Sequence, residues 1–329
     1  MQLAKPPAGG KATGDTVLAP GATISTAGLW TNLVLDPAIT FTQAFINGGA
    51  VSLGSVNNLT LGAGSVIDTS SGGVIAASGA AKGGAGGAIS LAAATPSQAI
   101  PFPTGNLTLG GTLDAIGATK GGALTLSAPS FLIAATSPAA NNPAVVALDP
   151  AFFTQGFSAY NLNSTGSITV APGTVVDVTE PTYQFSAASV LAPTGTAPAA
   201  AFTMALNPLY APNSAYTAIT QRAGASFSAK IAVLIGAREK TAPVLSIGDG
   251  AAINVDPGQA INLEAPGQIT IGGSLQAPGG NISVVSDFNT LSTLPVSTGI
   301  TSIWLGSQAV LEMCIRDRRK PAVVAKPRS

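Results

Sequence analysis

The chain has 329 residues, of which 9% are charged, with fourteen Lys and Arg side chains against fourteen Asp and Glu and no histidine. Soluble domains carry about 25% charged residues, so this sparse and balanced charge excludes electrostatic steering onto nucleic acid or an anionic membrane. The missing histidine is the side chain most often used for proton transfer near neutral pH and for metal binding. We therefore expect no catalysis, no cofactor, no bound metal and no nucleic-acid partner.

Several other classes of site lack their motifs. The single cysteine cannot form an intramolecular disulfide or a thiolate metal site. No apolar run reaches the roughly 18 residues that a membrane-spanning helix needs, so we expect no transmembrane segment. The glycine-rich runs at 82–88 and 119–123 lack the Gly-Lys-Ser/Thr ending of a phosphate-binding loop. We interpret them as tight turns in which glycine supplies a positive φ.

In chain order, residues 1–44 come first. Pro and Gly interrupt the first 30 residues, which contain no signal-peptide pattern of a charged start followed by an apolar region. We expect residues 1–44 to form irregular or partial first coils of the repeat that follows.

Residues 45–312 repeat one unit: a short alternating strand, a Gly or Pro turn, and a second strand that usually ends in Asp. Its copies begin at Leu59, Leu107, Ile168, Leu245, Ile269 and Ile303. The clearest stretch is 258–286, where Ile261 and Ile282 are 21 residues apart, which is the length of one coil of a β-solenoid. Its alternation points an apolar set inward, and strands of successive coils would pair in parallel about 4.8 Å apart.

Two segments interrupt this pattern, at 127–160 and 181–215, and both are rich in Ala and Pro. Because proline denies a sheet its hydrogen-bond donor, we predict two long loop excursions. The first contains an aromatic group made of Phe152, Phe153, Phe157 and Tyr160. These side chains are candidates for a patch that contacts a sugar or protein partner, and the alternative is that they pack the loop onto the coil.

Four aspartates recur at the end of the repeated unit: Asp68, Asp114, Asp177 and Asp256. One interpretation is a cation site or the acid pair of a polysaccharide-cleaving β-helix. The other is structural, because Asp accepts hydrogen bonds from the turn that follows it. We favour the structural interpretation, since a catalytic pair occurs once whereas this residue recurs with the fold.

The segments "GALTLSAP", "LSIGDGAAINVD" and "IWLGSQAVLE" resemble the repeat region of filamentous-haemagglutinin-like exoproteins, the secreted partners of bacterial two-partner secretion. The resemblance spans about residues 45–312. It implies a right-handed parallel β-helix that is secreted or displayed at the Gram-negative cell surface. It also implies an outer-membrane transporter as export partner and adhesion to host-cell or matrix glycans or proteins. Complete members carry a signal peptide and an N-terminal secretion module, which indicates that this chain is an internal fragment.

The sequence thus predicts an all-β shaft segment of a large bacterial adhesin, without catalysis, whose two excursions make the contacts. Two alternatives stay open: a carbohydrate-active β-helix with Asp177 or Asp256 as acid or base, and the passenger domain of an autotransporter. The repeat stops at Glu312. Residues 313–329 change composition abruptly, and the hexapeptide beginning at Met313 resembles a translated sequencing adapter. We expect them to be a disordered basic tail of foreign origin.

Overall fold

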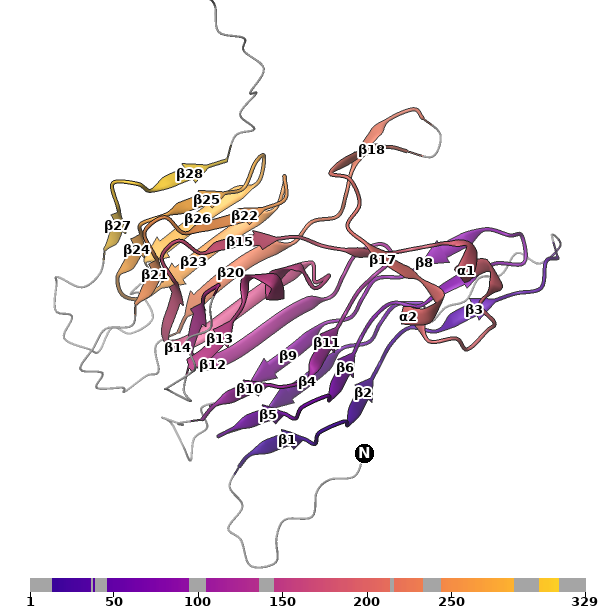
Figure 1. Ribbon diagram of the computed structural model, residues 1–329, viewed down its shortest axis with the longest axis horizontal. Helices are drawn as coiled ribbons and strands as arrows, with labels where there is room; N and C mark the ends of the chain where they lie inside the picture. Colours follow the sequence, from indigo (N-terminus) through magenta and orange to yellow (C-terminus); the bar gives the residue numbers. More distant parts are fainter. Residues whose placement is uncertain are drawn as a thin grey trace, which may run out of the picture.

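Short parallel strands arranged in stacks are the main regular structure of the molecule (Figure 1). The computed structural model describes residues 14–36, 38, 46–94, 105–135, 145–213, 216–232, 244–286 and 302–313. Within these residues the chain passes through three stacks in turn, and each strand pairs mainly with strands one repeat away. This parallel, mostly β architecture is compatible with the predicted coils.

The first two stacks are divided into an N-terminal and a C-terminal part. In the N-terminal part, the first stack contains β1 (Thr16–Leu18), β5 (Leu59–Leu61) and β10 (Leu107–Leu109). The second stack there contains β2 (Thr23–Ser25), β6 (Val66–Asp68) and β11 (Thr112–Asp114). In the C-terminal part, the second stack contains β15 (Val175–Val178), β22 (Ala252–Val255), β25 (Ser274–Gln276) and β28 (Val310–Glu312).

The third stack runs through both parts as the main path of an 11-stranded sheet. Along that path lie β4 (Val51–Gly54), β9 (Ile89–Ala92), β12 (Ala123–Ile133), β14 (Ala159–Val170), β20 (Ser226–Ile231), β23 (Ala260–Ala265) and β26 (Asn281–Ser286). Beside the C-terminal halves of β12 and β14, the first stack resumes with β13 (Val145–Leu148), β21 (Leu245–Ile247), β24 (Ile269–Ile271) and β27 (Ile303–Leu305). We call this stacked body the shaft.

The interior of the shaft is mostly aliphatic away from the joint, and alternation along each strand produces it. In β23, Ile261 and Leu263 are fully buried, whereas Asn262 between them is partly exposed. Ile261 pairs with Ile282 of β26, so the predicted repeat of 21 residues is the pairing distance here. Parallel pairing stacks like residues on like, and the buried side chains form one core cluster that extends from Val51 to Ala277.

The shaft has a joint between its two parts. Among the described residues, no strand pairing links β10 to β13 or β11 to β15, so the first two stacks are interrupted there. A short 3₁₀ helix, η1 (Pro150–Thr154), packs against β15 at this joint, and the backbone N–H of Thr179 donates to its Phe153 carbonyl at 3.2 Å. Of the strands that the structure describes, only β12 and β14 of the third stack carry a backbone ladder across this joint.

The segment 127–160 does not leave the shaft as a long loop where it is described. Residues up to Ile133 continue β12, and β13 pairs with β12 in parallel. Pro129 is accommodated at a bulge, where the β12–β14 register shifts between Ala128 and Ser130. Its missing donor is therefore tolerated inside a strand, because the ladder is already irregular at that position.

The glycine runs have a different cause from the one expected. The glycines at 83, 84, 86, 87, 121 and 122 do not have positive φ. Instead, an added Cβ on Gly122 would lie 1.8 Å from the carbonyl oxygen of Gly87, and one on Gly87 would lie 1.8 Å from that of Gly49. The tight-turn interpretation is wrong at these positions, where glycine permits close backbone stacking between layers.

Two regular strands already lie within residues 1–44, since β1 and β2 pair in parallel with β5 and β6. A lateral sheet projects from this part of the shaft and contains β3 (Trp30–Asn32), β7 (Gly73–Ile75) and β8 (Ala81–Gly83). The expected tail, apart from Met313, lies outside the described residues.

Candidate partner-binding surface

Residues 181–225 leave the shaft after β15 and return to it at β20, and we call this segment the arm (Figure 1). It contains β16 (Thr182–Gln184), α1 (Ala187–Leu191), α2 (Pro198–Ala201), β17 (Thr203–Ala205), β18 (Tyr210–Pro212) and β19 (Ile219–Gln221). Its strands pair antiparallel with each other, β16 with β17 and β18 with β19. The arm therefore does not extend the parallel stacks.

The arm folds locally because its sequence contains several helix and turn signals. The backbone N–H of Ser186 donates to Ser189 Oγ at 2.9 Å and fixes the start of α1. Pro198 begins α2, where a missing N–H costs nothing. In the turn of the β18–β19 hairpin, the Asn213 side chain accepts from the N–H of Thr217 at 2.9 Å. The arm is consequently an ordered element with its own small core.

That core is aromatic and joins the arm to the lateral sheet. Tyr183 and Phe202 stack at 4.9 Å between ring centroids. Trp30 of β3 meets Phe202 edge-on at 5.1 Å, and Phe185 lies 6.1 Å from Trp30. Aromatic pairs in these geometries contribute about 0.5–1.5 kcal/mol each beyond their buried area. The N-terminal part of the shaft thus supplies one side of the core of an element that begins about 150 residues later in the sequence.

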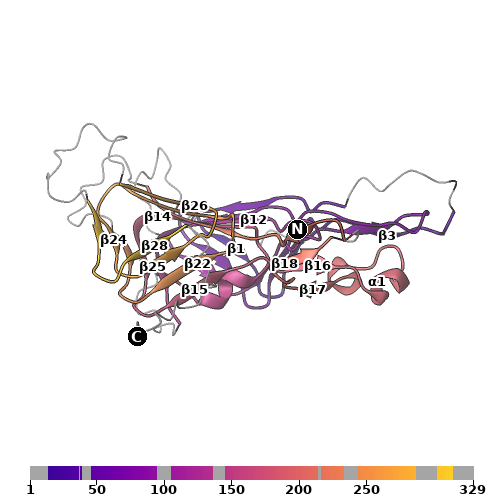
Figure 2. The same cartoon turned by 90° about the horizontal axis from the view of Figure 1, so that it is seen from above.

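Hydrogen bonds at the outer edge of β3 complete this attachment. Trp30 Nε1 donates to the Ala192 carbonyl at 3.1 Å, and the N–H of Gly195 donates to the Trp30 carbonyl at 3.0 Å. The Asn32 amide donates to the carbonyls of Val190 and Ala192. Figure 2 shows α1 beside β3, away from the stacks. The arm therefore covers an edge strand that would otherwise be open.

The two roots of the arm are each fixed by a buried carboxylate. At the returning root, Arg222 binds Asp256 with two hydrogen bonds of 3.0 and 2.7 Å and also donates to the Asn207 carbonyl at 2.9 Å. At the departing root, Glu180 is 2% exposed, and its Oε1 accepts from the backbone N–H of Gly121. Burial raises the pKa of Glu180 to about 7.

The outward side of the arm is apolar and uncharged. Residues 181–221 contain no Asp, Glu, Lys or Arg. Leu191 at the end of α1 is 82% exposed, and Tyr216 at the hairpin turn is 84% exposed with a left-handed φ of +54°. The other large exposed apolar side chains of the arm include Val190, Met204, Leu206, Tyr210 and Ile219. Exposed apolar side chains gathered on one projecting element are typical of contact surfaces.

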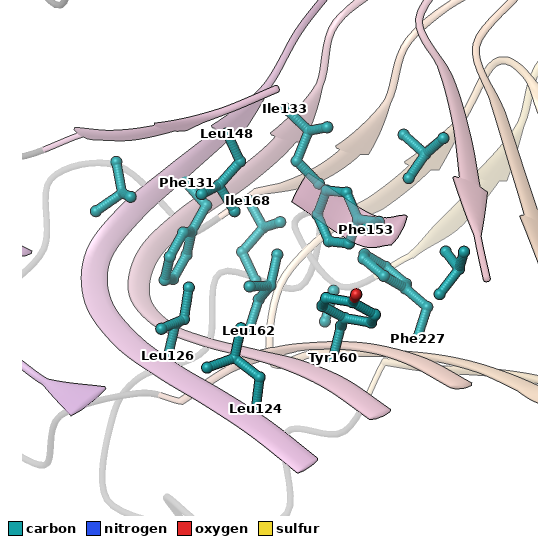
Figure 3. Packing of buried hydrophobic residues seen from close by; sticks show 14 of the residues in the cluster. Leu124, Leu126, Phe131, Ile133, Leu148, Phe153, Tyr160, Leu162, Ile168 and Phe227 are labelled. Atoms are coloured by element: carbon teal, nitrogen blue, oxygen red, sulfur yellow. The ribbon is translucent and has the colours of Figure 1, made fainter. Parts of the chain in front are cut away.

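The aromatic group predicted as a partner contact lies mostly in the interior. Phe153, Phe157 and Tyr160 are fully buried at the joint, and Phe152 is half-buried. Figure 3 shows Phe153 of η1 beside Tyr160 and Phe227, with ring centroids 5.3 and 5.7 Å from that of Phe153. Burial also raises the pKa of the Tyr160 hydroxyl, which accepts from the N–H of Gln155. In these positions the three rings fill the joint and present no exposed patch.

The four recurring aspartates lie in three different settings. Asp68 and Asp114 are register partners on β6 and β11, and burial together with the charge of Asp68 raises the pKa of Asp114. Asp177 is exposed and accepts from Asn254 Nδ2 at 2.8 Å. Asp256 is bound by Arg222. Both carboxylates named for the enzyme alternative therefore already have side-chain partners.

Within the part of the chain that the structure describes, no group of three or more His, Cys, Asp or Glu side chains is arranged to hold a metal ion. Among the described helices, none combines the length and the apolar character needed to cross a membrane. Comparisons of the chain with protein-family models, with curated proteins and with solved structures found no match.

Sequence reasoning missed the residues that attach the arm. Trp30 gives no local sign of its partners, which lie more than 150 residues away. A usable signal exists for the roots, because the uncharged stretch 181–221 is bounded by Glu180 and Arg222. Charged residues that flank a long uncharged segment are good candidates for side chains that anchor it.

Proposed function

We propose that this chain is a shaft segment of a large secreted or cell-surface bacterial adhesin, built as a right-handed parallel β-helix and without catalysis of its own. The parallel stacks with an aliphatic interior support the architectural half of this proposal. The resemblance of the repeats to filamentous-haemagglutinin-like exoproteins supports the family and the export by an outer-membrane transporter.

The adhesive part of the proposal rests on the uncharged, apolar surface of the arm. An ordered element that projects from a repetitive body, and that keeps large apolar side chains in water, is placed to meet a partner. Because residues 181–221 carry no charge, recognition there depends on apolar and hydrogen-bonding contacts. The partner is a glycan or protein of the host cell or matrix, and its binding changes little with salt.

Binding of the purified chain to host cells, matrix proteins and a glycan array tests the proposal. The arm variant combines Leu191→Ala with Tyr216→Ala, and the matched control combines Val175→Ala with Val285→Ala, which are exposed apolar residues on the shaft strands β15 and β26. We expect at least about a tenfold loss of affinity for the arm variant and no loss for the control.

Equal binding by both variants would contradict the arm as the contact surface. Release of reducing ends from polysaccharides, abolished by Asp177→Asn or Asp256→Asn, would instead favour the enzyme alternative.

A further inference from the structure

Glu180 stands at the hinge where the arm leaves the shaft. It lies between the end of β15 at Val178 and the start of β16 at Thr182, and it is 2% exposed. One carboxyl oxygen, Oε1, accepts from the backbone N–H of Gly121, while Oε2 has no hydrogen-bond partner among the described residues. Both oxygens of a buried carboxylate normally accept hydrogen bonds, because burying a charge without hydrogen-bond partners costs free energy.

The neighbours of Glu180 do not neutralise it. Lys120, which precedes β12, is exposed, and its charge lowers the pKa of Glu180 less than burial raises it. The charge of Asp256 acts in the opposite direction, and Arg222 is already occupied by Asp256 with two hydrogen bonds. Tyr160 of β14 also faces Glu180 electrostatically, but burial holds its hydroxyl in the neutral form.

We propose that Glu180 is a protonation switch that sets how firmly the arm is held against the shaft. With a neutral Glu180 the root stays packed beside Gly121 and the joint, and the arm remains docked on β3. When Glu180 is ionised, the closed root buries a charge, and one of its two oxygens accepts no hydrogen bond from the described residues. Opening of the root, which exposes this charge to water, therefore becomes more favourable. This inference does not depend on the adhesive function of the arm.

The direction of the pH effect follows from the pKa of Glu180, which is about 7 when the root is closed against a usual value of 4.5. The docked arm gains this stabilisation in full below about pH 4.5 and loses it as the pH rises to about 7. Within that window the ratio of open to docked arm increases up to about tenfold per pH unit, and above it the ratio stays constant.

Hydrogen exchange of the intact chain tests the switch, followed by mass spectrometry from pH 5 to 8.5. The reporting amides lie in 183–195, where the N–H groups of Tyr183 and Gly195 bond to the Gly117 and Trp30 carbonyls. Peptides from 260–265 in β23 serve as the internal reference. After correction for intrinsic exchange, we expect arm protection to fall up to about tenfold per pH unit and to level off near pH 7, with constant protection in β23.

Two substitutions locate the responsible carboxyl. Glu180→Gln keeps the size of the side chain and removes its charge, so its arm is expected to remain equally protected at every pH. Asp114→Asn is the matched control, since Asp114 also has a raised pKa and acts electrostatically on Tyr183 of the arm. This control should keep the pH dependence of the unsubstituted chain.

Three results would overturn the proposal. The first is protection of the arm in the unsubstituted chain that does not change with pH. The second is an unchanged pH dependence of this protection in Glu180→Gln, and the third is loss of the pH dependence in Asp114→Asn. If circular dichroism shows that Glu180→Gln does not fold, the fluorescence of Trp30 in a Trp304→Phe chain decides the matter. Trp30 is buried against the arm, so its emission reports the fraction of open arm when a fixed urea concentration leaves the arm partly open at pH 5. Under that condition the emission must shift further to the red as the pH rises toward 7, and a constant emission rejects the switch.

Discussion

The shaft and the arm are held in place by different kinds of interaction. In the shaft, buried residues such as Leu263 and Ile269 repeat from layer to layer, and most strands are hydrogen bonded on both edges. The arm depends on a few particular contacts, made by Trp30, Glu180 and Arg222. Repetition spreads stability over equivalent positions, whereas an element attached once concentrates it in individual side chains.

The joint is where the shaft itself loses that redundancy, so the largest effect is expected there. Phe153→Ala removes a fully buried ring that contacts Phe152, Tyr160 and Phe227, and no neighbouring layer repeats it. We expect it to lower the free energy of unfolding by about 3–5 kcal/mol, measured by urea denaturation. Ile261→Val, in a regular layer, should cost about 1 kcal/mol. Equal losses in the two variants would mean that the joint is no weaker than a regular layer.

The returning root of the arm comes next. Arg222→Met leaves Asp256 without its ion pair, and their side chains are 15% and 8% exposed. We expect a loss of about 3 kcal/mol in the docking of the arm, the lower end for a buried pair, measured from hydrogen exchange in 183–195. Lys230→Met breaks the Lys230–Glu264 pair of the shaft, whose side chains are 49% and 43% exposed, and should cost less than about 1 kcal/mol. Similar losses would remove the distinction between the two ion pairs.

The contact at the lateral sheet gives the smallest effect. Trp30→Phe keeps an aromatic ring against Phe202 but loses the hydrogen bond from Nε1 to the Ala192 carbonyl. Because that carbonyl also accepts from the Asn32 amide, it is not left unpaired. We expect about 1 kcal/mol of weaker docking, seen as faster proteolysis within the arm. A loss above about 3 kcal/mol would show that the indole packs more tightly than these contacts imply.

The strands of the shaft could be predicted because their signal is local. Alternation with period two sets which residues face inward, so the pairing of Ile261 with Ile282 follows from the sequence alone. The aromatic group at 152–160 could not be placed in this way, because composition does not tell whether a ring points into the core or into solvent. Burial of Phe153 depends on its contacts with Tyr160 of β14 and Phe227 of β20.

The arm could be predicted as an interruption but not as an attached element. Its proline and alanine content marks a departure from the strands. Its docking on Trp30 and Asn32 is a contact across about 160 residues, for which a single sequence contains no pattern. Proline was also an ambiguous signal, since Pro129 lies within β12 at a bulge.

The joint also has a mechanical consequence. Across it the backbone ladder between β12 and β14 continues, while the described strands of the first two stacks do not pair with one another there. We therefore expect the joint to resist bending more strongly on the side of this ladder than on the other two sides. The arm spans the same interruption, with its roots beside β22 and β12 and its far end on β3. We therefore expect the arm to brace the joint, so that weaker docking of the arm lowers the force needed to bend the shaft there.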